Sequence, residues 1–206
     1  MNILVIYGSP KGERSNTLRL TNAFLEGICH SQKDCFPDID RLHIAQMDIN
    51  SCLGCFSCWK TTPGKCCIYD DMNIILEKLL WADLTIWSFP LYYFSLPGKL
   101  KTVIDRQLPL SLPFMLSNAE GGGHPTRYDM SKKKTVLIST CGFYTAKQNY
   151  DSVTAQFDRI CGKGNYTTLF CGEGELFRVP ELSNRIEEYL AAVQQAGQEY
   201  VSGGIK

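Results

Sequence analysis

The stretch that decides the fold is residues 3–17, ILVIYGSPKGERSNT. Its first part, Ile3–Tyr7, is a continuous apolar run that is typical of a buried strand. The segment Asn16–Ile28 then places apolar residues at helical spacing, which predicts an amphipathic helix. The polar loop between them therefore lies at the carboxyl end of a strand and the amino end of a helix. Free backbone N–H groups and the positive end of the helix dipole favour an anion there.

The side chains of this loop suit a phosphate group. Ser9, Ser15, Asn16 and Thr17 supply hydrogen-bond donors, and Lys11 or Arg14 could add positive charge. An alternative interpretation is that Ser15 or Asn16 only caps the helix. The loop has neither the Gly-Lys-Ser/Thr of a Walker loop nor a Gly-x-Gly-x-x-Gly fingerprint. A monophosphate such as that of FMN fits the loop better than a dinucleotide.

Composition sets the broad class. The chain has 206 residues, 44% of them hydrophobic, and Lys+Arg equals Asp+Glu at 21 each. This length suits one domain, residues 1–206, with a full core. A formal net charge of zero argues against nucleic acid as a partner, because binding to phosphate backbones needs a basic surface. No signal peptide or apolar stretch of membrane-spanning length is visible, so we expect a cytoplasmic protein without a membrane partner.

Strand-like and helix-like segments alternate along the chain. This alternation predicts an α/β fold with a doubly wound parallel sheet of five strands and helices on both faces. The strands are expected at 3–7, 40–45, 84–88, 135–139 and 166–171, and the helices at 16–28, 70–82, 97–106, 150–161 and 181–200. Residues 107–134 form an insertion too long for an ordinary connection. We expect a flap or an oligomer contact there, or else a mobile surface loop.

Two further loops follow predicted strands and are rich in aromatic or small residues. The first contains Phe89, Pro90, Leu91, Tyr92, Tyr93 and Phe94, and the second Thr140, Cys141, Gly142 and Phe143. Aromatic side chains at a strand end could stack on a planar ring. Gly142 would let the backbone approach a ligand closely. The alternative is that Phe89, Phe94 and Phe143 belong to the core at the sheet edge.

Together these loops resemble the flavodoxin-like NAD(P)H-dependent FMN reductase family. The resemblance rests on residues 8–17, on Pro90-Leu91-Tyr92 followed by Pro97-Gly98-x-Leu100-Lys101-x-x-x-Asp105-Arg106, and on Thr140-Cys141-Gly142. It implies a sheet of order 2-1-3-4-5. It also implies FMN with its phosphate on the first loop, its ring against the second and its polar edge toward the third. NADH or NADPH would be the co-substrate, and homodimers or higher homo-oligomers are expected.

Cysteines are the second strong signal. The chain has ten, of which Cys52, Cys55, Cys58 and Cys66 follow the spacing C-x2-C-x2-C-x7-C in a cysteine-rich loop, residues 51–69. Four converging thiolates suit a [4Fe–4S] cluster or a structural zinc, and unligated thiols are the other alternative. The spacing resembles the iron–sulfur flavoproteins, a branch of the same superfamily. Cys67 would then be a surplus core residue.

Other cysteines and charged residues give weaker signals. Cys29, Cys35, Cys141, Cys161 and Cys171 are scattered and are expected mostly as small apolar core residues. Asp105 and Arg106 would form an ion pair with each other at the end of a helix, or organise a dimer contact. No histidine has metal-ligand spacing, and no side-chain acid or base is obligatory, so no catalytic residue is named.

The sequence therefore predicts an FMN-dependent NAD(P)H oxidoreductase. Its electron acceptor would be a quinone, flavin or metal species, small or carried on a protein. The alternative is an iron–sulfur flavoprotein that acts as an electron-transfer protein.

Overall fold

The computed structural model describes residues 1–32, 36–117 and 121–203. Its centre is a parallel five-stranded sheet of order β2-β1-β3-β4-β5, which confirms the predicted fold class and strand order. The strands are β1 (Asn2–Tyr7), β2 (Asp38–His43), β3 (Leu84–Pro90), β4 (Lys134–Thr140) and β5 (Thr167–Cys171). All strand pairs are parallel, from Ile3 opposite Leu84 in the middle of the sheet to Thr140 opposite Cys171 at one edge.

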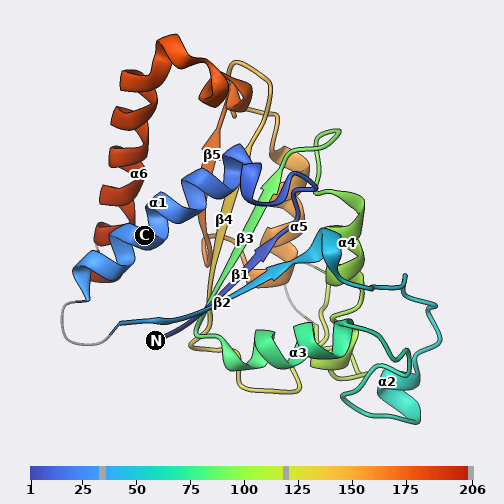
Figure 1. The fold of residues 1–206 in the computed structure, drawn as a ribbon. Helices are drawn as coiled ribbons and strands as arrows, with labels where there is room; N and C mark the ends of the chain where they lie inside the picture. Colours follow the sequence, from blue (N-terminus) through green and yellow to red (C-terminus); the bar gives the residue numbers. More distant parts are fainter. Residues whose placement is uncertain (33–35, 118–120, 204–206) are drawn as a thin grey trace.

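Helices cover both faces of the sheet (Figure 1). One face carries α1 (Asn16–Ser31) and α6 (Ser183–Ser202), and the other carries α3 (Met72–Trp81), α4 (Gly98–Asp105) and α5 (Asp151–Cys161). A single short helix, α2 (Ser57–Lys60), lies within the cysteine-rich segment 51–69. None of the helices in the described ranges is long and apolar enough to span a bilayer.

Side chains of β1 alternate between two apolar cores, because successive residues of a strand point to opposite faces. Ile3 and Val5 pack under α1 and α6, whereas Leu4 and Ile6 pack under α3, α4 and α5. All four are fully buried. The continuous apolar run in the sequence is thus the signature of a strand covered on both sides.

Glycine sets the close approach of α1 to α6. A Cβ built on Gly27 would lie 1.9 Å from the carbonyl oxygen of Gln194, and one on Gly197 would lie 2.1 Å from that of Phe24. No real side chain fits at such distances, so the two helices meet backbone to backbone. This contact fixes α1, and with it the loop that precedes the helix.

Element boundaries differ from the predictions mainly at edges. β2 begins at Asp38, two residues before the predicted start, because its pairing with β1 runs from Asn2 opposite Asp38. The polar side chains at the beginning of β2 gave no strand pattern in the sequence, but an edge strand tolerates them because its pairing depends on the backbone. The predicted helix from residue 70 begins instead at Met72, with Asp71 at the N-cap.

Candidate functional site

The three predicted loops lie together at the carboxyl ends of the strands and are connected to one another by hydrogen bonds. The hydroxyls of Thr17 and Thr140 are 2.6 Å apart, which joins the first loop to the third. The Leu91 N–H donates to the Thr140 carbonyl at 2.8 Å, and the Gly8 N–H donates to the Ser88 carbonyl at 2.9 Å. The carboxyl ends of parallel strands thus bring residues more than a hundred positions apart into one site.

The first loop ends in a capped helix. Ser15 is the N-cap of α1 and accepts from the Leu18 N–H at 3.4 Å, so Ser15 does cap the helix, and its role in phosphate binding stays a prediction. Capping leaves the N–H groups of Asn16 and Thr17 without a partner inside the helix. The Asn16 amide donates to the Gly174 carbonyl at 2.7 Å. The side chains of Ser9, Ser15, Asn16 and Thr17 are all buried, which preorganises polar groups around these free N–H groups.

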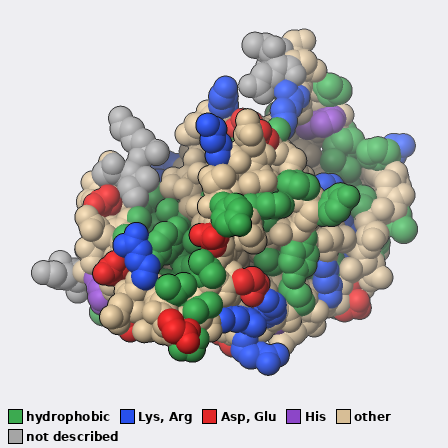
Figure 2. All heavy atoms as spheres, turned by 90° about the horizontal axis from the view of Figure 1, so that it is seen from above, with side chains coloured by type: hydrophobic (Ala, Val, Ile, Leu, Met, Phe, Trp, Pro, Cys, Tyr) green, Lys and Arg blue, Asp and Glu red, His purple; other side chains and the backbone are tan. Residues whose placement is uncertain are grey.

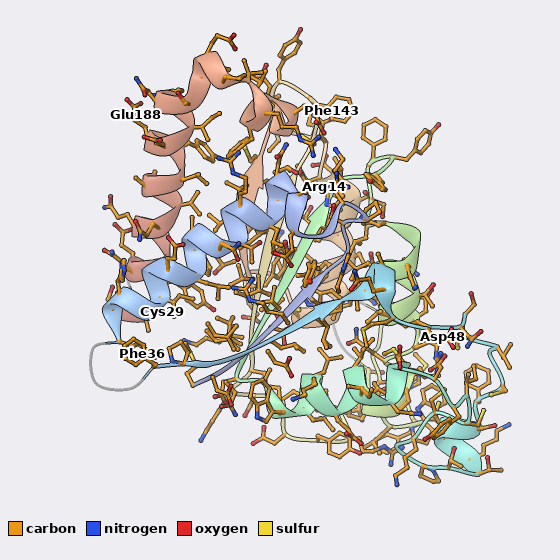
Figure 3. All side chains as sticks on the ribbon, viewed as in Figure 1. Arg14, Cys29, Phe36, Asp48, Phe143 and Glu188 are labelled. Carbon is orange, nitrogen blue, oxygen red and sulfur yellow. The ribbon has the colours of Figure 1, made fainter. Side chains whose placement is uncertain are left out.

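Positive charge gathers beside this helix end. A hollow of about 430 Å³ is lined by four cations and one carboxylate: Lys11, Arg14, Arg19, Arg178, Glu13, together with Asn16. Figure 3 places Arg14 at the same end of the molecule as Phe143 of the third loop. An anion bound at the first turn of α1 would therefore meet a basic surface as well as the helix dipole.

The second loop is a tight turn that exposes aromatic rings. Tyr92 and Ser95 exchange backbone hydrogen bonds of 2.9 and 3.0 Å. Between them, Tyr93 and Phe94 have φ angles of +47° and +64°, which L-residues with large side chains seldom adopt. The Ser152 hydroxyl donates to the Phe94 carbonyl and fixes the turn from α5.

The second and third loops meet through stacked rings. Phe94 and Phe143 lie with ring centroids 5.3 Å apart and an interplanar angle of 17°. Tyr93 and Tyr144 are almost fully exposed, and a Cβ on Gly142 would meet nothing within 4 Å. Seen from above in Figure 2, hydrophobic side chains spread across the middle of this face. The edge thus offers apolar ring surface and open space to a planar ligand.

The predicted ring-binding residues fall into two groups. Phe89 and Cys141 are buried in the core, so the core interpretation holds for Phe89. Phe94 and Phe143 are close to half exposed, so it is wrong for these two rings. Pro90 and Leu91 lie partly buried where β3 ends, and Tyr92, Tyr93 and Phe94 reach the surface.

A fourth loop, after β5, also belongs to this site and was not predicted from the sequence. Its backbone bonds to the third loop, since Gly174 N–H donates to the Cys141 carbonyl and Glu173 N–H to the Phe143 carbonyl, both at 2.8 Å. A Cβ on Gly174 would lie 2.7 Å from Thr140 Cβ, so only glycine fits. Two glycines directly after a predicted strand, Gly172 and Gly174, were the available signal.

His43 also shapes the first loop. Its ring stacks on Tyr7 with centroids 4.6 Å apart, and its Nε2 lies 3.0 Å from the Ser9 carbonyl oxygen. Nothing in the sequence around His43 indicated this contact, because it depends on the pairing of β2 with β1.

The cysteine-rich segment lies beyond the end of α3, away from the carboxyl ends of the strands (Figure 1). It lines a separate hollow. All four predicted ligands, Cys52, Cys55, Cys58 and Cys66, line it. Its other walls are Leu53, Phe56, Cys67, Ile68, Arg106, Leu108 and Pro109. Among the described residues no three His, Cys, Asp or Glu side chains form a group that could hold a single metal ion. The cluster therefore stays a prediction.

Two thiols of this hollow lie close together. Cys55 Sγ and Cys67 Sγ are 3.6 Å apart, and both residues are exposed. The expectation that Cys67 is a core residue is wrong, because it lies on the loop that returns to the hollow. Hydrogen bonds from the Ser57 hydroxyl and backbone, and then from Cys67, lower the pKa of Cys55 to about 7. Burial, followed by the neighbouring Cys66, raises the pKa of Cys58.

The remaining cysteines are only partly core residues. Cys141 and Cys171 are buried, whereas Cys29 and Cys161 are half-buried. Cys35 lies outside the described residues.

Arg106 joins α4 to the cysteine segment through a buried ion pair with Asp70. Both side chains are 0% exposed. The guanidinium donates hydrogen bonds to both carboxylate oxygens, and the bond from Nη2 to Oδ1 is 2.9 Å long. Nη2 also donates to Cys66 Sγ at 3.3 Å. Burial by itself would raise the pKa of Asp70, but hydrogen bonds from Arg106 and Asn50 outweigh it and lower the pKa to about 2.

The expected pair between Asp105 and Arg106 is wrong. Consecutive residues on a helix point in different directions. Asp105 instead pairs with Lys101 one turn earlier, at 2.5 Å on the surface.

The described parts of the insertion 107–134 pack against the cysteine segment. The Trp59 indole N–H donates to the carbonyls of Leu108 and Ser111 at 3.2 and 3.0 Å. Its ring lies 4.8 Å from that of His124. The insertion thus covers one side of the cysteine hollow, and its expected role as a flap or oligomer contact stays a prediction.

Comparison with known proteins agrees with this architecture. A family model described as a flavodoxin-like fold matches residues 1–202. An iron–sulfur flavoprotein of Methanocaldococcus jannaschii is 34% identical over 126 residues, 59% of this chain and 60% of its own. An FMN-dependent NADH:quinone oxidoreductase of Trichormus variabilis is 26% identical over 151 residues, 69% and 70% of the two chains. The chain spans about half to three-fifths of the length of the iron–sulfur flavoproteins it matches.

Solved structures share the fold over almost the whole chain. An NAD(P)H:quinone oxidoreductase from Methanothermobacter marburgensis superimposes with a TM-score of 0.70 at 17% identity, covering 97% of this chain and 96% of that one. An FMN-dependent NADH-azoreductase from Bacillus anthracis, solved in complex with FMN, gives 0.67 at 18% identity, covering 97% and 98%.

Proposed function

The chain belongs to the flavodoxin-like family, and on that premise we propose that it is an FMN-dependent oxidoreductase that takes electrons from NADH or NADPH. The observation that carries the proposal is that the three loops meet at the carboxyl ends of the strands, where the hydroxyls of Thr17 and Thr140 are in contact. Ligands of open α/β sheets bind at such strand ends. The names of the quinone oxidoreductase relatives support the reaction class.

The first loop would hold the FMN phosphate. The free N–H groups of Asn16 and Thr17 and the buried hydroxyls of Ser9 and Ser15 suit phosphate oxygens, and Lys11 adds charge. Lys11 now pairs with Glu175 at 3.2 Å on the surface. Such an exposed pair contributes little, so the ammonium is available to a bound phosphate.

The aromatic surfaces of the second and third loops would hold the isoalloxazine ring. Phe94 and Phe143 supply apolar faces, and the Gly142 backbone would face the polar edge of the ring. Bound FMN would supply the hydride and electron chemistry. The residues of this chain bind and orient the ring and exclude water from one side, and no side-chain acid or base is required of them.

A second function, an iron–sulfur electron-transfer protein, is favoured by the cysteine hollow. Its four motif thiols would hold a [4Fe–4S] cluster, which would supply electron-transfer chemistry there. Arg106 Nε, buried without a hydrogen-bond partner among the described residues, is a donor left over at this hollow. A relative named as an iron–sulfur flavoprotein supports the same alternative.

Binding of FMN tests the first proposal. In a fluorescence titration, the double variant Ser9→Ala/Ser15→Ala should bind FMN about 100-fold more weakly, because it loses two hydroxyls and each hydrogen bond to a charged group contributes about 1.5–3 kcal/mol. Ser31→Ala, at the other end of α1, is the matched control and should bind as the wild type does. Equal affinity of the double variant would remove the phosphate assignment.

Anaerobic reconstitution separates the two functions. The oxidoreductase should be yellow and should oxidise NADH or NADPH rapidly when a quinone is added. The electron-transfer protein should be brown, with iron and sulfide bound, and should turn over slowly with both nicotinamides. Size-exclusion chromatography with light scattering would test the homodimer that the resemblance implies.

A further inference from the structure

Arg106 is the one charged residue that lines the cysteine hollow among the residues the structure describes. It follows the last residue of α4, and its side chain is completely buried. The bidentate contact with Asp70 and a 2.8 Å bond from Nη1 to the Asn50 carbonyl fix the guanidinium plane. An arginine held in this way presents its remaining N–H groups in fixed directions.

One of those remaining groups, Nη2, donates to Cys66 Sγ at 3.3 Å and also to the Ile68 carbonyl at 3.5 Å. Nε is buried and has no hydrogen-bond partner within residues 1–32, 36–117 and 121–203. A buried donor without an acceptor is destabilising and rare in native proteins. Its presence here therefore indicates an acceptor that the polypeptide itself does not supply.

The walls of the hollow limit what that acceptor can be. Apart from Arg106 they consist of apolar side chains and the sulfurs of five cysteines. No side-chain oxygen of the residues that the structure describes lines it. An inorganic sulfide of a cluster held by the four motif cysteines would supply the missing acceptor.

We propose that Arg106 is a positioning residue that donates hydrogen bonds to sulfur, through Nη2 to Cys66 and through Nε to a second sulfur of a bound iron–sulfur cluster. The inference rests on the iron–sulfur alternative of the proposed function. Asp70 neutralises the guanidinium, so Arg106 acts through its oriented N–H dipoles. These stabilise the more negative, reduced cluster more than the oxidised one, and so raise its reduction potential.

The test compares the reduction potential of the reconstituted wild type with that of Arg106→Lys. Lysine keeps the positive charge near Asp70 but has no planar N–H groups. The variant should keep its iron, sulfide and FMN. Its reduced cluster should be disfavoured about tenfold, a shift of about 59 mV for one electron. Arg127→Lys is the matched control, since the Arg127 guanidinium donates to the carbonyls of Pro109 and Ser111 at the edge of this region, and the potential of this variant should equal that of the wild type.

The outcomes are separable. Equal potentials in wild type and Arg106→Lys, with the cluster present in both, would overturn the role of Arg106 alone. A wild type that takes up no iron and sulfide would overturn the cluster and this inference together. If Arg106→Lys does not fold, wild type labelled with [15Nε]arginine decides the matter. Pulsed EPR of the reduced cluster should detect a weak coupling to 15N, and its absence would refute the hydrogen bond from Nε.

Discussion

Asp70→Asn should destabilise this protein far more than an ordinary loss of charge. Removing Asp70 leaves the Arg106 guanidinium buried at 0% exposure without its counter-ion. Breaking a buried pair by deleting one partner typically costs about 3–5 kcal/mol. Because asparagine keeps one acceptor oxygen and Arg106 keeps the Asn50 carbonyl, we expect about 3 kcal/mol. Asp105→Asn, which breaks only the surface pair with Lys101, is the control and should cost less than about 1 kcal/mol.

Acid should produce the same loss in the wild type. The folded state lowers the pKa of Asp70 from 3.8 to about 2, so this contribution is complete above pH 4 and disappears as the pH falls toward 2. A shift of about two units corresponds to about 2–3 kcal/mol. Urea unfolding at pH 7 and at steps from pH 5 down to pH 2, followed by circular dichroism, measures both effects. A cost below 1 kcal/mol for Asp70→Asn at pH 7, or equal costs for both variants, would refute the reasoning.

Two further predictions follow from close contacts and from the cysteines. Gly197→Ala should lower the Tm by several degrees, because its Cβ would lie 2.1 Å from a backbone oxygen and overpacking costs about 1–3 kcal/mol. The control is Gly98→Ala, where nothing lies within 4 Å of the added Cβ, and its Tm should be equal to or higher than that of the wild type. Equal losses of Tm in the two variants would contradict the helix contact. In reconstituted protein, Cys55→Ser should abolish iron and sulfide binding while FMN stays bound, whereas Cys67→Ser should keep both; metal analysis in which Cys67→Ser alone loses iron would reassign the ligand set.

Residues close in sequence carried most of the correct predictions. Ile3–Tyr7 is recognisable as a doubly covered strand because all five residues are apolar, and a parallel sheet then places its loop beside those after β3 and β4. The Thr17–Thr140 contact follows from that topology. The capping role of Ser15 was equally readable, because N-caps are local.

Contacts that depend on tertiary packing could not be predicted from the sequence. Asp70 and Arg106 are 36 positions apart, and nothing local indicates that α4 directs Arg106 toward the cysteine segment. The same holds for His43 on Tyr7 and for the loop after β5. The prediction that Cys67 is buried was wrong for a related reason. Free cysteine is usually a buried residue, but the loop that returns to the hollow places Cys67 at the surface.

The affinity for FMN relative to riboflavin tests the central claim most directly, since the two ligands differ only in the phosphate. If the free N–H groups at the start of α1 bind that phosphate, at least two charge-assisted hydrogen bonds, each about 1.5 kcal/mol, separate the ligands. Fluorescence titration should then show FMN binding at least about 100-fold more tightly than riboflavin. Equal dissociation constants for the two ligands would contradict the account.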